Sequence, residues 1–529
     1  MQRSFTFVLL LVVLFACIGP LAAQDAVVWP TTEWPTSTPE EQGMDSARLL
    51  EFLSRVEERN LGLDNLTVIR NGHVVLDANW YPYTPDTPHQ LYSATKSVVS
   101  LLAGIALDQG IIESLDQPIL DFFPGRTIAN LNDEKLAATV GDVLTMNYWL
   151  ACLNNGEATY EAMHNAPDTI QPILDVPVGV PGMGINYCDL TPHLMLGALQ
   201  ESLGRPVLEY AHENLLQPMG ITDYIWRADS AGVPFGGYDL YLTPHDAARI
   251  GYLALRNGDW NGQQIVSPEW IETSTCADPA QCPFYDSQGY GYYWWMLPPD
   301  FYSAIGLAGQ YIAVSPDHGL VVIALTNGRE GTKPYSWIPY LLNQDLVGTV
   351  VSDEPLPANP EVVAELDARL ESIANPPAPQ TAAPIPEAVM ALSGVTYGFE
   401  EPLQLWPEPA FMAEERFGFP MGAERFTLTF DAEEEATLDL AFSDGYTASL
   451  TIGLDGVPRL NDTRFGPLAA SGSWLPGAQV GLTMDLDFIG QGDTQTLTFR
   501  MSNGRMRVIW HDGALGVGES TYAQPEPGS

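Results

Sequence analysis

Two residues one helical turn apart carry the main chemical signal of this chain. Ser93 and Lys96 form the only Ser-x-x-Lys in the protein, which has just three lysines. The segment after Lys96 is apolar and suits a helix, so a helix that begins near Ser93 would place both side chains on one face. A neutral lysine can take the proton of a serine hydroxyl and make it nucleophilic. Burial and a helix N-terminus both favour the neutral amine. We therefore predict a nucleophile at Ser93 and its base at Lys96, rather than a surface lysine near a helix-capping serine.

A serine nucleophile also needs a group that delivers a proton to the leaving group and donors that stabilise an oxyanion. Tyr187 is the candidate for the first role. It follows a loop rich in Gly and Pro, residues 180–186, which could hold a side chain at the edge of a cleft. A tyrosine in such a place is more often a partly buried structural residue. The surrounding motifs must therefore decide between a catalytic and a structural role for Tyr187.

Further motifs supply that context in a fixed order over residues 37–345. They are Gln42-Gly43-Met44-Asp45, Ser93-Ala94-Thr95-Lys96, Leu115-Asp116-Gln117-Pro118, Tyr187-Cys188-Asp189, Thr243-Pro244-His245-Asp246 and Leu307-Ala308-Gly309-Gln310. In this order the chain resembles the serine β-lactamase and penicillin-binding-protein superfamily. The resembling branch contains class C β-lactamases, DD-peptidases, esterases and 6-aminohexanoate-oligomer hydrolases. Many ordered matches make this resemblance stronger than any single motif.

The resemblance implies a role for each matched residue. Ser93 would be acylated, Lys96 would be its base or proton relay, and Tyr187 would take the tyrosine place of the family's Tyr-x-Asn. The backbone N–H groups of Ser93 and Gln310 would form the oxyanion hole. Water would then release the acid from the acyl-enzyme. No cofactor is implied, and the sequence lacks His and Cys spacing for zinc, so we expect no metal site.

Three departures from the family pattern fall on residues expected to bind substrate. Asp189 replaces the usual Asn with an acceptor-only carboxylate. Leu307 stands where β-lactamases carry the lysine of Lys-Thr-Gly, so it offers no cation to a substrate carboxylate. Tyr148-Trp149 replaces the usual Ser-Gly with two bulkier side chains. The sequence favours two interpretations of this pair equally, a wall of the substrate cleft and ordinary aromatic core packing. Together the departures favour an uncharged ester or amide.

These residues predict a secreted serine hydrolase of esterase or amidase type that uses Ser93, Lys96 and Tyr187. One alternative is a peptidoglycan DD-peptidase or β-lactamase, against which the missing cation at Leu307 argues. Another is a non-catalytic penicillin-binding or sensor protein. The joint presence of the three catalytic candidates argues against that alternative.

Composition limits the partners of the protein. The chain has 529 residues, 46% of them hydrophobic, and a formal charge of −44. Such a surface repels nucleic acid and anionic membranes. We expect a small ester or amide substrate, no nucleic-acid partner and no membrane-spanning segment once the signal is removed.

The N-terminus has the features of an export signal. A basic residue precedes a short apolar run, and we predict a signal peptide over residues 1–23 that is cleaved before Gln24. Release to the periplasm or the exterior is favoured over lipid anchoring at Cys17. Four further cysteines remain, and sequence leaves all three of their full pairings open, although Cys276 and Cys282 could close a short loop.

The pattern along the chain predicts two structured regions. A β-lactamase-related hydrolase domain is expected over residues 36–352. It should contain a helix over residues 41–60, a hairpin turning at Asn71-Gly72, and strands near residues 309–314 and 320–325 that complete one antiparallel sheet flanked by helices, with a helical subdomain. A Pro-rich linker over residues 353–390 holds a short helix and leads to an antiparallel β domain over residues 391–523, where apolar residues alternate as in a barrel. The fold class is thus α/β with a C-terminal all-β barrel-like domain.

Overall fold

The computed structural model describes most of both regions. Described are residues 27–30, 32–147, 150, 166–178, 185–276, 284–285, 288–329, 333–405, 422–430, 432–475, 481–502, 505–513 and 517–526. The expected signal peptide with Cys17, the pair Tyr148-Trp149, and Cys152 and Cys282 lie outside these residues. Their predicted roles remain predictions.

A six-stranded antiparallel sheet forms the centre of the hydrolase domain, in the order β10-β11-β12-β13-β1-β2. Its strands are β1 (Leu63–Arg70), β2 (His73–Asn79), β10 (Trp295–Leu297), β11 (Phe301–Gly306), β12 (Gln310–Ser315) and β13 (Leu320–Thr326). The predicted hairpin turns at Asn71 and Gly72, which both have positive φ, as a two-residue hairpin requires. The first strand pairs with the last, so the predicted closure of the sheet by its C-terminal strands is confirmed.

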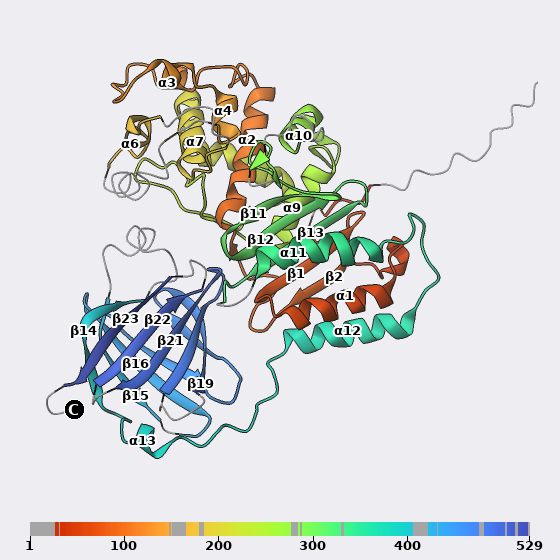
Figure 1. Ribbon diagram of the computed structural model, residues 1–529. Coiled ribbons are helices and arrows are strands. Elements are labelled where there is room, and N and C mark those ends of the chain that lie inside the picture. The colour runs from red at the N-terminus through yellow and green to blue at the C-terminus, as the bar shows by residue number, and fades with distance from the viewer. Residues whose placement is uncertain are drawn as a thin grey trace, which may run out of the picture.

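Each face of the sheet is covered by helices because the strands alternate apolar side chains between two cores. Ile312 and Val321 belong to one core, which includes α9 (Pro244–Leu255). Ala313 and Val322 belong to the other. That second core packs against α1 (Ser46–Arg59), α11 (Pro334–Leu341) and α12 (Pro360–Ala374) (Figure 1). The helices predicted over residues 41–60 and near residue 360 are therefore present, and they bury one face of the sheet.

A helical subdomain lies beyond one end of the sheet (Figure 1). It is built around α2 (Thr95–Asp108) and α7 (Leu190–Leu203), whose buried side chains share one core. The smaller helices there are α3 (Asp133–Ala137), α4 (Val140–Leu144), α6 (Ile170–Asp175), α8 (Val207–Ala211) and α10 (Pro268–Ser274). Among the described residues, no helix has both the length and the hydropathy needed to cross a bilayer.

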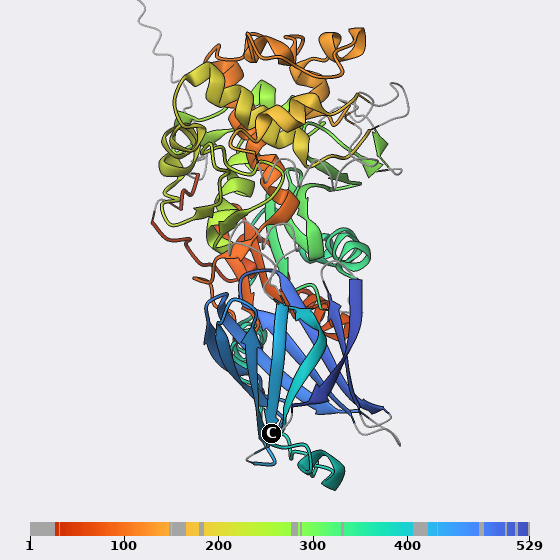
Figure 2. The ribbon, with the colours of Figure 1, turned by 90° about the vertical axis from the view of Figure 1, so that its left-hand side faces the viewer.

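The C-terminal region is a closed barrel of nine strands, reached through an extended linker and α13 (Glu387–Met390). The barrel strands are β14 (Thr396–Gln404), β15 (Gly422–Thr429), β16 (Glu435–Phe442), β17 (Thr447–Gly453), β19 (Gly466–Trp474), β20 (Gly481–Phe488), β21 (Asp493–Ser502), β22 (Arg505–Asp512) and β23 (Val517–Pro525). A bridge between β17 and β19 closes the ring, and β18 (Arg459–Thr463) pairs only along β19. The predicted fold class is confirmed. The barrel lies directly against the hydrolase domain (Figure 2).

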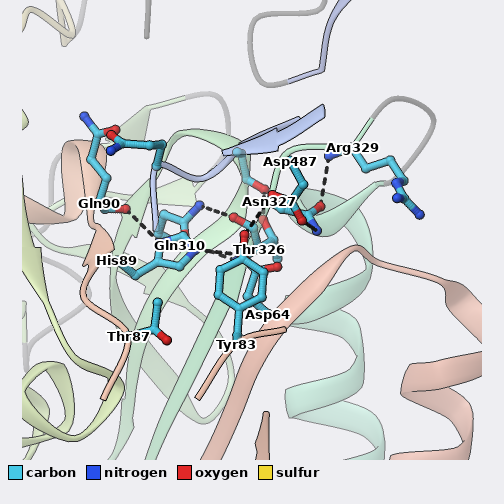
Figure 3. A network of polar contacts seen from close by, with 12 residues as sticks. Asp64, Tyr83, Thr87, His89, Gln90, Gln310, Thr326, Asn327, Arg329 and Asp487 are labelled. Atoms are coloured by element: carbon cyan, nitrogen blue, oxygen red, sulfur yellow. Dashed lines mark hydrogen bonds and ion pairs between the residues drawn. The ribbon is translucent and has the colours of Figure 1, made fainter. Parts of the chain in front are cut away.

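A buried polar cluster joins the two regions (Figure 3). Asp487 on β20 accepts a hydrogen bond of 2.8 Å from the Tyr83 hydroxyl of the hydrolase domain. Beside it, the Asp64 carboxyl lies 2.7 Å from Nε2 of His89. Burial, together with the nearby Asp64, raises the pKa of Asp487 to about 7. Burial also lowers the pKa of His89 to about 4.

Compared with the wild type, the Asp487→Asn variant is expected to gain stability as pH rises. An unfolded Asp loses its proton near pH 4, whereas folded Asp487 keeps its proton up to about pH 7, so its contribution to stability falls over that window. Asn has no such proton, so the variant lacks this pH-dependent loss of stability. Between pH 4 and 8 the difference in free energy of unfolding should grow by about 2–4 kcal/mol in favour of the variant. Urea unfolding across this range measures it, and parallel curves would contradict the prediction.

Candidate active site

The Ser93 turn connects a short strand to the first helix of the subdomain. It follows β3 (His89–Gln90) and consists of a 3-10 turn over Tyr92–Ala94 that runs directly into α2. Tyr92 has a φ of +46°, an uncommon conformation for a large side chain. Such a bend before a helix presents the half-buried Ser93 at the helix N-terminus. The helix predicted to begin near Ser93 is therefore present.

Lys96 lies one helical turn after Ser93, and its amine is surrounded by hydrogen-bond acceptors. Nζ donates to Ser93 Oγ at 2.8 Å, to Asp189 Oδ1 at 2.5 Å and to the Gly237 carbonyl at 2.6 Å. The side chain is buried, with 1% of its surface exposed. Three acceptors around one nitrogen match the three donors of an ammonium group.

The charge state of Lys96 differs from the sequence-based expectation. Burial lowers the pKa of Lys96, as predicted, but the Asp189 carboxylate outweighs it with help from Tyr187, and the pKa is raised overall. Asp189 precedes α7 and points to Lys96 instead of capping its own helix. The neutral resting lysine that we predicted is thus wrong. An ion pair with Asp189 holds the resting amine protonated.

Gly237 lets this ion pair form. A Cβ atom at Gly237 would lie 2.6 Å from the Asp189 carbonyl oxygen, closer than real contacts allow, and 3.0 Å from the Asp189 Cβ. The absence of a side chain therefore brings the Gly237 carbonyl to Lys96 and the loop to Asp189. Gly237 could not be identified from the sequence, where its local signal is the doublet Gly236-Gly237.

Tyr187 reaches the same two residues from the neighbouring loop. Its ring centroid lies 4.8 Å from Lys96 Nζ. Burial raises the pKa of the phenol, although the Lys96 charge and hydrogen bonding with Ser93 and Lys96 act in the opposite direction. The ring also packs against Tyr290 and Trp295, which fix its orientation. The structure thus brings Ser93, Lys96 and Tyr187 together.

A cavity of about 420 Å³ opens beside Ser93 and Tyr187. Its other lining residues are Trp295, Leu297, Ile305, Gly306, Leu307, Tyr311, Tyr335 and Pro339. Leu307 therefore lies where a bound substrate would meet it. No Lys, Arg, Asp or Glu belongs to this described lining, so the wall is apolar with phenol groups. Trp295 and Tyr335 could not be identified from the sequence, because they come from β10 and α11 and carry no motif of their own.

The loop that replaces Lys-Thr-Gly leads into the second predicted oxyanion residue. Gln310 begins β12 opposite Gly306 of β11. Its side chain points away from the cavity, where the amide donates to the Thr326 carbonyl at 2.9 Å and accepts from the Thr326 N–H at 3.1 Å. These bonds anchor the Gln310 backbone beside the turn formed by Ala308 and Gly309, which both have positive φ. The oxyanion role of the Ser93 and Gln310 N–H groups remains a prediction.

The remaining predicted site residues have different outcomes. Asp189, expected to contact substrate, has 35% of its side chain exposed but binds Lys96 directly. Tyr148 lies outside the described residues. Cys188, between Tyr187 and Asp189, and Cys276 are disulfide-bonded. In the described part of the chain, no group of three His, Cys, Asp or Glu side chains could hold a metal ion.

Comparison with known proteins gives matches over the hydrolase domain. A family model described as Beta-lactamase matches residues 54–342. The 6-aminohexanoate-dimer hydrolase of Paenarthrobacter ureafaciens is 21% identical over 333 residues, which cover 59% of this chain and 84% of that protein.

One solved structure shows the same fold, and a second aligns with a lower score. A putative 6-aminohexanoate-dimer hydrolase from Bacillus anthracis aligns with a TM-score of 0.50 and 17% identity, over 62% of this chain and 90% of that one. An octameric penicillin-binding protein homologue from Pyrococcus abyssi aligns with a TM-score of 0.44 and 17% identity, over 91% of this chain and 100% of that one.

Proposed function

Because this chain belongs to the β-lactamase family and is a serine hydrolase of that family, we propose that it cleaves esters or amides of uncharged acyl groups through an acyl-enzyme on Ser93. One observation carries the proposal. The Ser93 hydroxyl lies 2.8 Å from the Lys96 amine at the wall of an apolar cavity. The name of the Paenarthrobacter relative supports including amides among the substrates.

The proposed reaction begins with proton transfer from Ser93. At rest Lys96 is protonated and the Tyr187 phenol is neutral, so the reactive form has lost one proton from this pair. The pair then accepts the Ser93 proton while Oγ forms a bond to the substrate carbonyl carbon. Tyr187 returns a proton to the leaving oxygen or nitrogen as its bond to carbon breaks. Water repeats the sequence and releases the acid, which restores the Ser93 hydroxyl.

The cavity supports a preference for uncharged substrates. Its described lining offers no cation, and the Lys96 amine next to Ser93 is already paired with Asp189. A substrate carboxylate would lose water there without gaining a partner, which costs free energy. An apolar or aromatic acyl group would instead contact side chains such as Trp295, Leu307 and Tyr335.

Covalent labelling tests the proposal directly. A fluorophosphonate probe should label the protein once, and mass spectrometry of the peptides should place the adduct on Ser93, because only an activated hydroxyl attacks this phosphorus. A fluorescent penicillin, whose carboxylate finds no cation in the cavity, should label much more slowly. Absence of a fluorophosphonate adduct, or an adduct at another residue, would refute the assignment. Faster labelling by the penicillin would favour the DD-peptidase or β-lactamase alternative.

We also propose that the protein works after export from the cytoplasm. The apolar N-terminal run and the predicted cleavage before Gln24 support this proposal. The disulfide bonds of Cys188 and Cys276 support it further, since such bonds persist in oxidising compartments.

A further inference from the structure

The connection between β20 and β21, residues 489–492, reaches from the barrel to the segment that precedes Ser93. We propose that this barrel tip is a positioning element of the active site, which holds the Ser93 turn and Gln310 in the geometry needed for attack. The inference rests on the proposed function and extends it to the second domain. It makes the barrel a working part of the hydrolase.

Within the described residues, three hydrogen bonds connect the barrel tip to the hydrolase domain. The Gly490 carbonyl accepts from the Gln90 N–H at 2.8 Å, and the Gln491 carbonyl accepts from the Tyr92 hydroxyl at 3.0 Å. The Gln491 side-chain oxygen accepts from the Tyr241 hydroxyl at 2.8 Å. Gln491 is buried, so these bonds are sheltered from water. Two of the three partners lie within three residues of Ser93.

Gly492 lies close to the side chains of Tyr92 and Gln310, one on each side of the predicted oxyanion hole. A Cβ atom there would lie 3.0 Å from the Tyr92 ring and 3.2 Å from Gln310 Nε2. It would also lie 3.2 Å from the His89 ring. Tyr92 immediately precedes Ser93, and the Gln310 side chain anchors the second predicted N–H donor. The barrel tip is thus in contact with the supports of both donors, although it does not line the substrate cavity.

The conformation of Tyr92 explains why such support matters. Its positive φ is unfavourable for a residue with a large side chain and persists only where surrounding contacts hold it. The bond from its hydroxyl to Gln491 and the packing on Gly492 are such contacts. Oxyanion donors act most strongly in the transition state, so a small displacement of the Ser93 turn should lower kcat more than it raises KM.

A matched pair of glycine variants tests the barrel tip. Gly492→Ala adds one methyl group against Tyr92 and Gln310 at a φ of +64°. Gly445→Ala adds the same methyl group at a φ of +87° in another barrel turn, where nothing lies within 4 Å. Both carry the backbone cost of a left-handed alanine, but only Gly492→Ala presses on the active site. We expect Gly492→Ala to lower kcat and the rate of fluorophosphonate labelling about tenfold, with KM within about twofold of wild type.

The outcomes separate this inference from the proposed function. Equal labelling rates for Gly492→Ala and Gly445→Ala would overturn the inference. If Gly492→Ala does not fold, Tyr92→Phe removes the hydroxyl bond to Gln491 and should slow labelling about fivefold, and an unchanged rate would overturn it. If the wild type is not labelled at all, the proposed function fails. In that case hydrogen exchange still tests the contact between the barrel tip and the Ser93 turn. The backbone amides of residues 90–94 should exchange faster in Gly492→Ala than in Gly445→Ala, and equal exchange rates would overturn the inference.

Discussion

Ser93→Ala is expected to reduce hydrolysis of a short p-nitrophenyl ester by at least about 10³-fold, because the attacking oxygen is removed. The fold should be retained, since Lys96 keeps its bonds to Asp189 and to the Gly237 carbonyl. Initial rates of p-nitrophenolate release, measured with the circular dichroism of both proteins, check this prediction.

Ser100→Ala is the matched control for the nucleophile variant. Ser100 lies on the same helix and is fully buried, and its hydroxyl has no hydrogen-bond partner among the described residues. Loss of that hydroxyl should leave the rate within about twofold of wild type. Turnover by Ser93→Ala at the wild-type rate would show that another residue attacks the substrate.

Asp189→Asn is expected to shift the pH–rate profile toward neutral pH. Asp189 raises the pKa of Lys96 against the effect of burial, so removal of its charge should lower that pKa. If the basic form of the pair attacks, the rising limb of kcat/KM should move to lower pH, which raises the rate near pH 7. The change also restores the amide of the family's Tyr-x-Asn. Profiles of kcat/KM between pH 5 and 10 measure the shift.

Lys96→Ala distinguishes this effect from a general disturbance of the site. It removes the amine while Asp189, partly exposed, can remain hydrated. We expect a loss of about 10³-fold at every pH, without the shift seen for Asp189→Asn. A profile of Asp189→Asn that coincides with wild type would mean that the Lys96 charge state does not limit the reaction.

Much of the architecture could be predicted because it depends on local pattern. The hairpin at Asn71-Gly72, the helix after Ser93 and the buried strand β13 follow from turn residues and hydrophobic periodicity. The alternation beyond residue 393 likewise predicted an antiparallel β domain. Its closure into a barrel depends on the bridge between β17 and β19, which no local signal contains.

The catalytic candidates of the site were predictable, but much of its cavity wall and its electrostatics were not. Ser93 and Lys96 are three residues apart, so one helical turn places them together. Their resemblance to a known family added Tyr187. The assignment of Asp189 as a substrate contact did not anticipate its bond to Lys96, 93 residues away. A pKa depends on which charges end up nearby and how much water remains, and neither is visible in sequence spacing.

The sequence by itself therefore determined that Ser93 and Lys96 lie side by side, and it determined the two kinds of domain, since helical spacing and alternating strands impose these at short range. Only the tertiary structure decided that Lys96 is paired with Asp189 and the Gly237 carbonyl, and that the barrel tip contacts Tyr92 about 400 residues earlier in the chain. The physical reason is that hydrogen bonds and charges act over a few ångströms in space, and folding alone brings such distant residues within that range.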